Sequence, residues 1–100
     1  MKQEISLLVF IEAKKGHRQQ QIDAYNALAP IVHNEKGCLQ YELKEVQDYE
    51  NEFVLIEKWA SEEDLAAHDI TPHMIEADKA SPAFRAKPAT VIKLSDIISV

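Results

Sequence analysis

The 100-residue chain is poor in cysteine, tryptophan, glycine and proline: it has one cysteine, one tryptophan, two glycines and four prolines. The single cysteine, Cys38, excludes an intrachain disulfide framework and fits a reducing compartment. So few glycines and prolines, without a low-complexity segment, argue against a disordered chain. The apolar segment at residues 5–13 is too short for a membrane-spanning helix, and no cleavage site of a signal peptide follows it.

Positive charge is also scarce. The chain has 11 Lys and Arg against 17 Asp and Glu, which gives a formal charge of −6. Because no basic cluster offsets this balance, neither nucleic acid nor an anionic membrane surface is expected as a partner. What is present, 46% hydrophobic and 28% charged residues, is typical of a globular protein. We therefore expect a single domain over residues 1–100 and a cytoplasmic location.

Hydrophobic periodicity predicts four strands and three helices. The strands are expected at residues 5–13, 39–44, 53–60 and 89–98. The first helix is expected at residues 17–35. The second helix should begin after the capping residue Ser61, and the third should run from Thr71-Pro72 to Ser81-Pro82. Pro30 lies inside the first helix and is expected to kink or split it, because proline lacks an N–H donor. Gly37 is expected directly after the end of that helix.

This order of elements, β-α-β-β-α-α-β, is the split βαβ or ferredoxin-like pattern. The sequence thus predicts an α+β fold: one four-stranded antiparallel sheet with its helices on one face. The first and third strands carry apolar residues on both faces, although the chain offers no second sheet to cover the free face. A homodimer that packs sheet on sheet is the expected solution.

The most informative segment for function runs from Glu57 to Met74, because it holds the only tryptophan and two of the four histidines. Trp59 lies at the end of a strand, on the same face as Glu57, and His68 and His73 lie in the helical turns that follow. The two imidazoles lie near opposite kinds of helix end and could divide acid and base work between them. The alternatives are that Trp59 is only a core aromatic and that each histidine has a surface or capping role.

A metal site is not expected from this spacing. His68 and His73 are five positions apart across a helix break, whereas two ligands on one helix face are usually four apart. Cys38 is expected to be a small buried hydrophobe, because no activating group is evident near it. His17 and His33, at the two ends of the first helix, are expected to be solvated.

Two motifs resemble the antibiotic biosynthesis monooxygenase (ABM) family: Glu35-Lys-Gly-Cys-Leu-Gln-Tyr-Glu-Leu43, and Ile56-Glu-Lys-Trp59 followed by His68-Asp-Ile-Thr-Pro-His-Met74. The second motif is most similar to the quinol monooxygenase members. The resemblance spans nearly the whole chain and is weakest at residues 82–88. It implies a dimeric α/β barrel, in agreement with the dimer expected from the strand faces.

The resemblance also implies a function: oxidation of a small phenolic or quinol-like aromatic by O2 without flavin, haem or metal. In this interpretation Trp59 forms a wall of the pocket, His68 is the base or anion partner, and His73 shapes the helix end or binds a hydroxyl. Tyr41, Glu57 and Phe53 are the expected substrate contacts.

Two other functions remain open. One branch of the family, isomerases of a phosphorylated signal molecule, carries a similar His-x-x-Thr-Pro-His segment, and a non-catalytic dimer that binds a small ligand is the third alternative. The haem-degrading branch is disfavoured, because residues 5–13 contain no Asn and no His follows His73.

Overall fold

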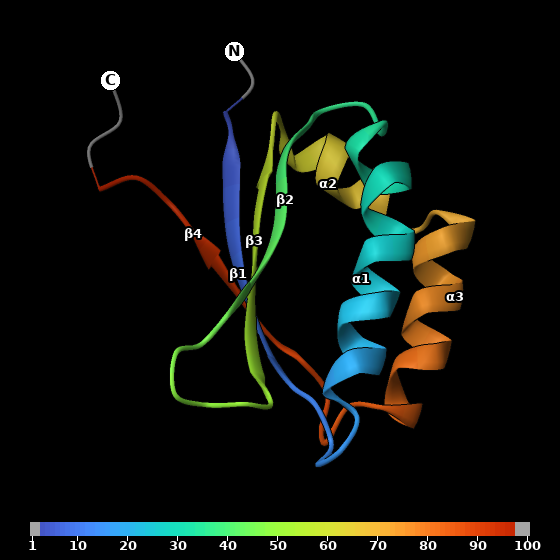
Figure 1. Cartoon of the computed structure of the whole chain (residues 1–100). Coiled ribbons are helices and arrows are strands. Elements are labelled where there is room, and N and C mark those ends of the chain that lie inside the picture. Colours follow the sequence, from blue (N-terminus) through green and yellow to red (C-terminus); the bar gives the residue numbers. More distant parts are fainter. Residues whose placement is uncertain (1–2, 98–100) are drawn as a thin grey trace.

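The computed structural model describes residues 3–97 and contains one sheet with its helices on one side (Figure 1). Its elements are β1 (Ile5–Glu12), α1 (Arg18–His33), β2 (Cys38–Glu45), β3 (Glu52–Trp59), α2 (Glu62–Asp69), α3 (Pro72–Ala80), a 3-10 turn (Ser81–Ala83) and β4 (Thr90–Leu94). The strand order is β2-β3-β1-β4, and every neighbouring pair is antiparallel. The α+β, ferredoxin-like fold class predicted from the sequence is confirmed.

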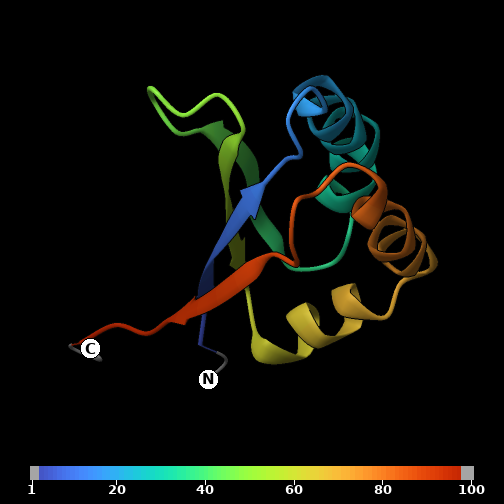
Figure 2. The same ribbon diagram turned by 90° about the horizontal axis from the view of Figure 1, so that it is seen from below.

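The side chains of the central strands alternate between a covered and an open face of the sheet. Leu7, Val9 and Ile11 of β1 are at most 7% exposed, and they point toward the helices. On β3 the buried positions are Phe53, Leu55, Glu57 and Trp59, as the period of two predicts. Figure 2 shows that all three helices lie on this one side of the sheet.

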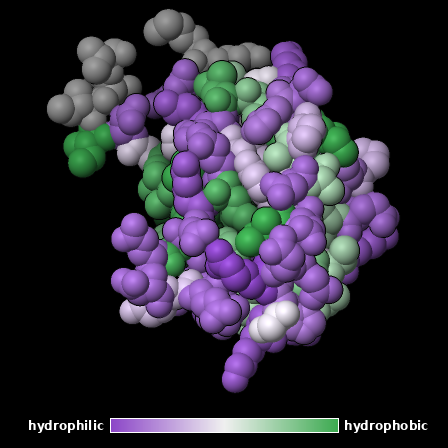
Figure 3. Space-filling view, viewed as in Figure 1, coloured by the Kyte–Doolittle hydropathy of each residue, from purple (hydrophilic) through white to green (hydrophobic). Residues whose placement is uncertain are grey.

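The opposite face of the sheet is apolar and uncovered. Leu8 pairs with Ile56 on one side and Ile92 on the other, and Phe10 pairs with Val54. Phe10 is 41% exposed and Ile92 is 42% exposed. Hydrophobic surface is visible in Figure 3 on the side of the strands away from the helices. Among residues 3–97, β1 is therefore fully buried on one face only.

The helix starts were predicted correctly, whereas details of the first helix and the last strand were not. The Ser61 hydroxyl accepts from the Asp64 N–H at 3.1 Å and the Thr71 hydroxyl from the Met74 N–H at 3.3 Å, so both capping predictions are confirmed. Helix α1 is not split at Pro30, because only one ladder hydrogen bond is lost one turn before the helix ends. No helix among residues 3–97 is long and apolar enough to cross a membrane.

Gly37 does not directly follow α1, since Asn34 occupies that position. It lies in the turn before β2 with φ of +82°, and a Cβ there would come within 2.6 Å of the Asp64 side chain. The last strand ends at Leu94 rather than at residue 98, which lies outside the described residues.

Candidate active site

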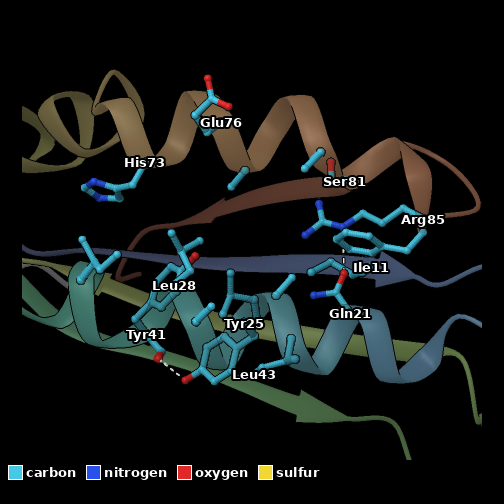
Figure 4. A pocket seen from close by; sticks show the side chains of 17 residues that line it. Ile11, Gln21, Tyr25, Leu28, Tyr41, Leu43, His73, Glu76, Ser81 and Arg85 are labelled. Carbon is cyan, nitrogen blue, oxygen red and sulfur yellow. Dashed lines mark hydrogen bonds between the residues drawn. The ribbon is translucent and has the colours of Figure 1, made fainter.

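A cavity of about 380 Å³ lies between α1, α3 and the inner face of the sheet (Figure 4). Its volume falls within the roughly 300–1,000 Å³ typical of small-molecule sites. Most of its wall is apolar, and the sheet and both helices contribute Ile11, Leu28, Ile31, Leu43, Leu55 and Ala77. A cavity of this size and composition suits a small aromatic molecule.

The polar groups of the cavity are few, and they lie toward different ends of it. His73, at the start of α3, lies at one end, and Arg85, after the 3-10 turn, lies at the other (Figure 4). Tyr41 and Tyr25 lie between them on the side of the sheet and α1. The Tyr25 hydroxyl donates to the Tyr41 carbonyl at 2.7 Å, and the two rings stack with centroids 5.9 Å apart. A ligand would therefore meet an imidazole, aromatic rings and a guanidinium in a mostly apolar space, whose remaining polar lining is Gln21, Glu76 and Ser81.

Glu35 joins the two histidines of the segment after β3. Its Oε2 lies 2.7 Å from His73 Nε2 and 2.9 Å from His68 Nδ1. Because a carboxylate only accepts, both imidazoles donate an N–H to it. The Thr71 hydroxyl that caps α3 also donates to the His68 carbonyl at 2.9 Å, which fixes the short connection between the two histidines.

This bonding pattern assigns the free nitrogen of the His73 ring. Nε2 faces Glu35, so Nδ1 is the atom without a hydrogen-bond partner among residues 3–97. A neutral imidazole that donates through one nitrogen can accept a proton at the other. His73, which lines the cavity, is thus arranged as a proton acceptor.

His68, Trp59 and Glu57 form a buried cluster behind the cavity. Trp59 is 0% exposed, and its ring centroid lies 4.5 Å from that of His68. The Trp59 Nε1 donates to Glu57 Oε1 at 3.0 Å, and Glu57 Oε1 lies 3.9 Å from His68 Nε2. The Tyr41 ring contacts His68 edge to face at 5.9 Å. Tyr41 therefore connects the cavity wall with the buried cluster.

Burial governs the ionisation of two groups in this region. It raises the pKa of Glu57, although the Trp59 N–H and His68 act in the opposite direction. Burial also raises the pKa of Tyr41 well above its ordinary value, and the neighbouring Glu57 adds to that effect. The Tyr41 phenol therefore stays protonated and can donate a hydrogen bond.

The structure divides the residues predicted from the sequence into three groups. Tyr41 and His73 line the cavity. Trp59, His68 and Glu57 do not line it; they support the wall from behind. Phe53 does neither, because it lies at the far end of β3, buried beneath the Arg18 guanidinium, which is 5.2 Å from the centre of its ring.

Three residues of this region were missed by sequence reasoning: Glu35, Gln21 and Arg85. Glu35 was placed at a helix end and in the first family motif without a role in the site, and nothing in the sequence pairs it with histidines 33 and 38 positions away. Gln21 is 2% exposed, yet it stands in a run of three glutamines that resembles a solvated helix face. Arg85 belongs to the segment where the family resemblance is weakest.

The same three side chains that form the hydrogen-bonded bridge could also hold a metal ion. One ligand atom each from Glu35, His68 and His73 lies within 4.8 Å of the others. Three protein ligands of this type are the usual minimum for zinc. The spacing of the two histidines in the sequence does not reveal this group, because its third member, Glu35, comes from the turn after α1.

The remaining candidates lie outside the cavity. Cys38 is half-buried, and burial raises the pKa of its thiol, as do the nearby Glu35 and Glu57, so the unreactive thiol form is favoured. His33 is exposed, and its Nε2 donates to the Tyr41 carbonyl at 3.0 Å. His17, at the other end of α1, contacts Gln20 and is partly exposed.

The fold and the cavity define an α+β domain of the ferredoxin-like type with a cavity of small-molecule size between its helices and its sheet. Over 98% of its length the chain superimposes with a TM-score of 0.88 on 98% of PA3566 from Pseudomonas aeruginosa, at 26% identity. In sequence it is 33% identical over 69 residues to "Putative monooxygenase YcnE" of Bacillus subtilis. These aligned residues make up 69% of this chain and 73% of that protein. It is 28% identical over 81 residues, 81% of its length, to the uncharacterized protein sll1783 of Synechocystis, and it spans 55% of that protein.

The family "Antibiotic biosynthesis monooxygenase" matches residues 5–80, which is most of the chain. The chain therefore belongs to the ABM family. The matched range includes β1 to β3 and all three helices, and it ends before Arg85 and β4.

Proposed function

We propose that this protein is a cofactor-independent monooxygenase that oxidises a small phenolic or quinol-like aromatic with O2. The observation that carries the proposal is an apolar cavity whose wall holds one imidazole, His73, with a free Nδ1 and a carboxylate behind its Nε2. Family membership and the name of the YcnE relative support an oxygenase activity.

The first step is removal of the hydroxyl proton of the substrate by His73 Nδ1. The resulting imidazolium is stabilised by Glu35, whose Oε2 lies 2.7 Å from its Nε2. Glu35 is held by His68, which is 2% exposed and packs against Trp59. The buried cluster therefore positions the base and does not touch the substrate.

The phenolate is then electron-rich enough to pass one electron to O2, which gives a phenoxyl radical and superoxide. These two recombine at a ring carbon, and return of the proton from His73 gives a hydroperoxide. Loss of water from this intermediate yields the quinone, so that a phenol and O2 become a quinone and water. The apolar wall keeps the radical pair together and excludes bulk water.

We further propose that the protein works as a homodimer in which the open faces of two sheets pack together. The uncovered face carries Leu8, Phe10, Ile56 and Ile92, and two of these side chains are more than 40% exposed in the single chain. Replacing Phe10 by Lys should yield a monomer in sedimentation experiments. Ile70→Lys is the matched control, because Ile70 is 74% exposed on the helical layer, and it should leave the dimer intact. A monomeric wild-type protein would contradict the dimer.

The function is tested by measuring O2 uptake with a panel of simple phenols, hydroquinone and naphthohydroquinone. We expect consumption of one O2 per quinone formed, with one atom of isotopically labelled O2 in the product. Conversion of an oxygenated substrate without O2 uptake would favour the isomerase. Binding without any turnover would favour the ligand-binding module, and both of these results would contradict the proposal.

A further inference from the structure

Arg85 is fixed by the backbone around it and presents its guanidinium to the cavity. The Lys14 N–H donates to the Phe84 carbonyl at 2.8 Å, and the Ala86 N–H donates to the Glu12 carbonyl at 2.8 Å, so the segment is tied to the end of β1. Figure 4 shows the guanidinium turned toward the cavity, with its Nε bonded to Gln21. Arg85 is thus a rigidly placed cation at the end of the cavity opposite His73.

The partner of this cation is neutral. Arg85 Nε donates to Gln21 Oε1 at 2.9 Å, and Gln21 is 2% exposed. None of the ion pairs between residues 3–97 includes Arg85. The acidic residue that acts on its pKa, Asp78, does not line the cavity but lines a hollow on the other side of Arg85. Burial removes hydration from this guanidinium and lowers the pKa of Arg85, and the opposing interactions with Tyr41 and Asp78 do not fully offset that effect.

Among residues 3–97, no hydrogen bond or ion pair engages the two terminal nitrogens of Arg85, which leaves them available for a ligand. A planar guanidinium binds a carboxylate through two parallel hydrogen bonds, which are charge-assisted and strong in apolar surroundings. The wall is otherwise mostly apolar and aromatic, and the carboxylate of Glu76, which also lines it, points away from the other lining side chains (Figure 4). The remainder of the ligand should therefore be a hydrocarbon or aromatic ring. An aromatic acid matches both features.

The distance between the two ends of the cavity restricts the shape of that acid. His73, in the first turn of α3, and Ser81, directly after the helix, both line the cavity wall, and eight residues of helix rise about 12 Å. A carboxylate attached directly to a small ring would be too close to the hydroxyl to reach both ends. A carboxylate on a short side chain suits the spacing better.

We propose that Arg85, held by Gln21, forms a carboxylate-binding subsite, and that the substrate is a phenol or quinol whose side chain carries a carboxylate. The reacting hydroxyl lies at His73, and the acid group lies at Arg85. The assignment of the reacting end rests on the function proposed above. The binding of the acid at Arg85 does not rest on it.

Calorimetric binding of 4-hydroxycinnamate and of its neutral methyl ester tests the subsite. In the wild type the acid should bind roughly 10-fold or more tightly than the ester, as expected for hydrogen bonds between charged groups. Arg85→Gln should abolish this preference and leave ester binding unchanged. Lys87→Gln is the matched control, because it removes a positive charge from the same segment but does not line the cavity. Equal affinity of acid and ester in the wild type, or an unchanged preference in Arg85→Gln, would overturn the subsite.

A second variant covers the case in which Arg85→Gln fails to fold. Gln21→Glu places a carboxylate next to the guanidinium, where it should form an ion pair and compete with the acid. We expect weaker binding of 4-hydroxycinnamate, unchanged binding of the ester and no fall in the thermal midpoint. Unchanged binding of the acid would contradict the subsite.

The same variants separate this inference from the proposed function. If the wild type binds the acid through Arg85 but consumes no O2 with any phenol, the oxygenase proposal fails and the subsite stands. If neutral quinols and phenolic acids are oxidised with equal KM in the wild type and in Arg85→Gln, the oxygenase stands and the subsite fails.

Discussion

The cavity wall and the buried cluster behind it contain the same kinds of side chain, but they have different surroundings. His73 on the wall has a side chain 23% exposed, whereas that of His68 in the cluster is 2% exposed. Tyr41 borders the cavity, while Trp59 is sealed between the sheet and α2. The shared residue is Glu35, which accepts a hydrogen bond from both histidines.

This difference shows that residue type alone does not identify the catalytic group. An imidazole that a ligand can reach can exchange a proton with it, whereas one that is sealed by an indole can only hold its neighbours in place. We therefore expect substitutions in the buried cluster to act mainly on stability and those on the wall to act mainly on binding and rate.

The largest loss of stability is expected for Trp59→Ala. The indole is 0% exposed, packs on His68 and donates to Glu57. Truncation of a buried aromatic to alanine typically costs about 3–5 kcal/mol. Chemical denaturation measures the change in the free energy of unfolding. Ile70→Ala, at a side chain that is 74% exposed, is the control and should change stability by less than about 0.5 kcal/mol. Equal effects of the two substitutions would refute the description of Trp59 as a core residue.

A smaller but more diagnostic contrast is expected between the two histidines. His68→Ala removes a buried hydrogen-bond donor from Glu35 and should cost roughly 1–3 kcal/mol of unfolding free energy. His73→Ala should cost less, because its side chain is partly exposed and water can replace it. Denaturation of both variants under the same conditions measures the difference. A larger loss of stability in His73→Ala than in His68→Ala would contradict the assignment of His73 to the cavity wall and of His68 to the supporting buried cluster.

The smallest expected effect is the contribution of Glu57 to the pH dependence of the free energy of unfolding. Its pKa is raised in the folded state, so the stability that this group contributes is complete below its ordinary value of 4.5 and is lost as the pH rises through the folded pKa. Glu57→Gln does not lose stability in this way, because its amide does not ionise, and the amide oxygen can still accept a hydrogen bond from the Trp59 N–H. We expect the variant to gain stability relative to the wild type between acidic and neutral pH. A stability difference that is constant with pH would show that burial does not disfavour the Glu57 carboxylate.

Much of the fold was predictable because its determinants are local. The alternation in β3 placed Glu57 and Trp59 on one buried face, and Ser61 and Thr71 marked two helix starts that the structure confirms. Pro30 does not split α1, because a proline close to a helix end removes a single hydrogen bond that the rest of α1 can spare.

The site was less predictable because its determinants are distant in sequence. Sequence reasoning located His68 and His73 but could not show that Glu35, from the turn after α1, would join them. It likewise could not bring Gln21 of α1 to Arg85, which lies 64 positions later. Such pairs depend on how the helices pack across the sheet, and no spacing rule encodes that.

The most direct test of the account compares O2 uptake by His73→Gln and His17→Gln with uptake by the wild type, using a phenol that the wild type oxidises. His17, at the start of α1, does not line the cavity. Loss of a general base typically lowers the rate about 100-fold to 10,000-fold, so His73→Gln should fall by this factor while His17→Gln stays at the wild-type rate. A His73→Gln protein that binds the phenol and oxidises it at the wild-type rate would contradict the central claim that His73 is the base at the cavity wall.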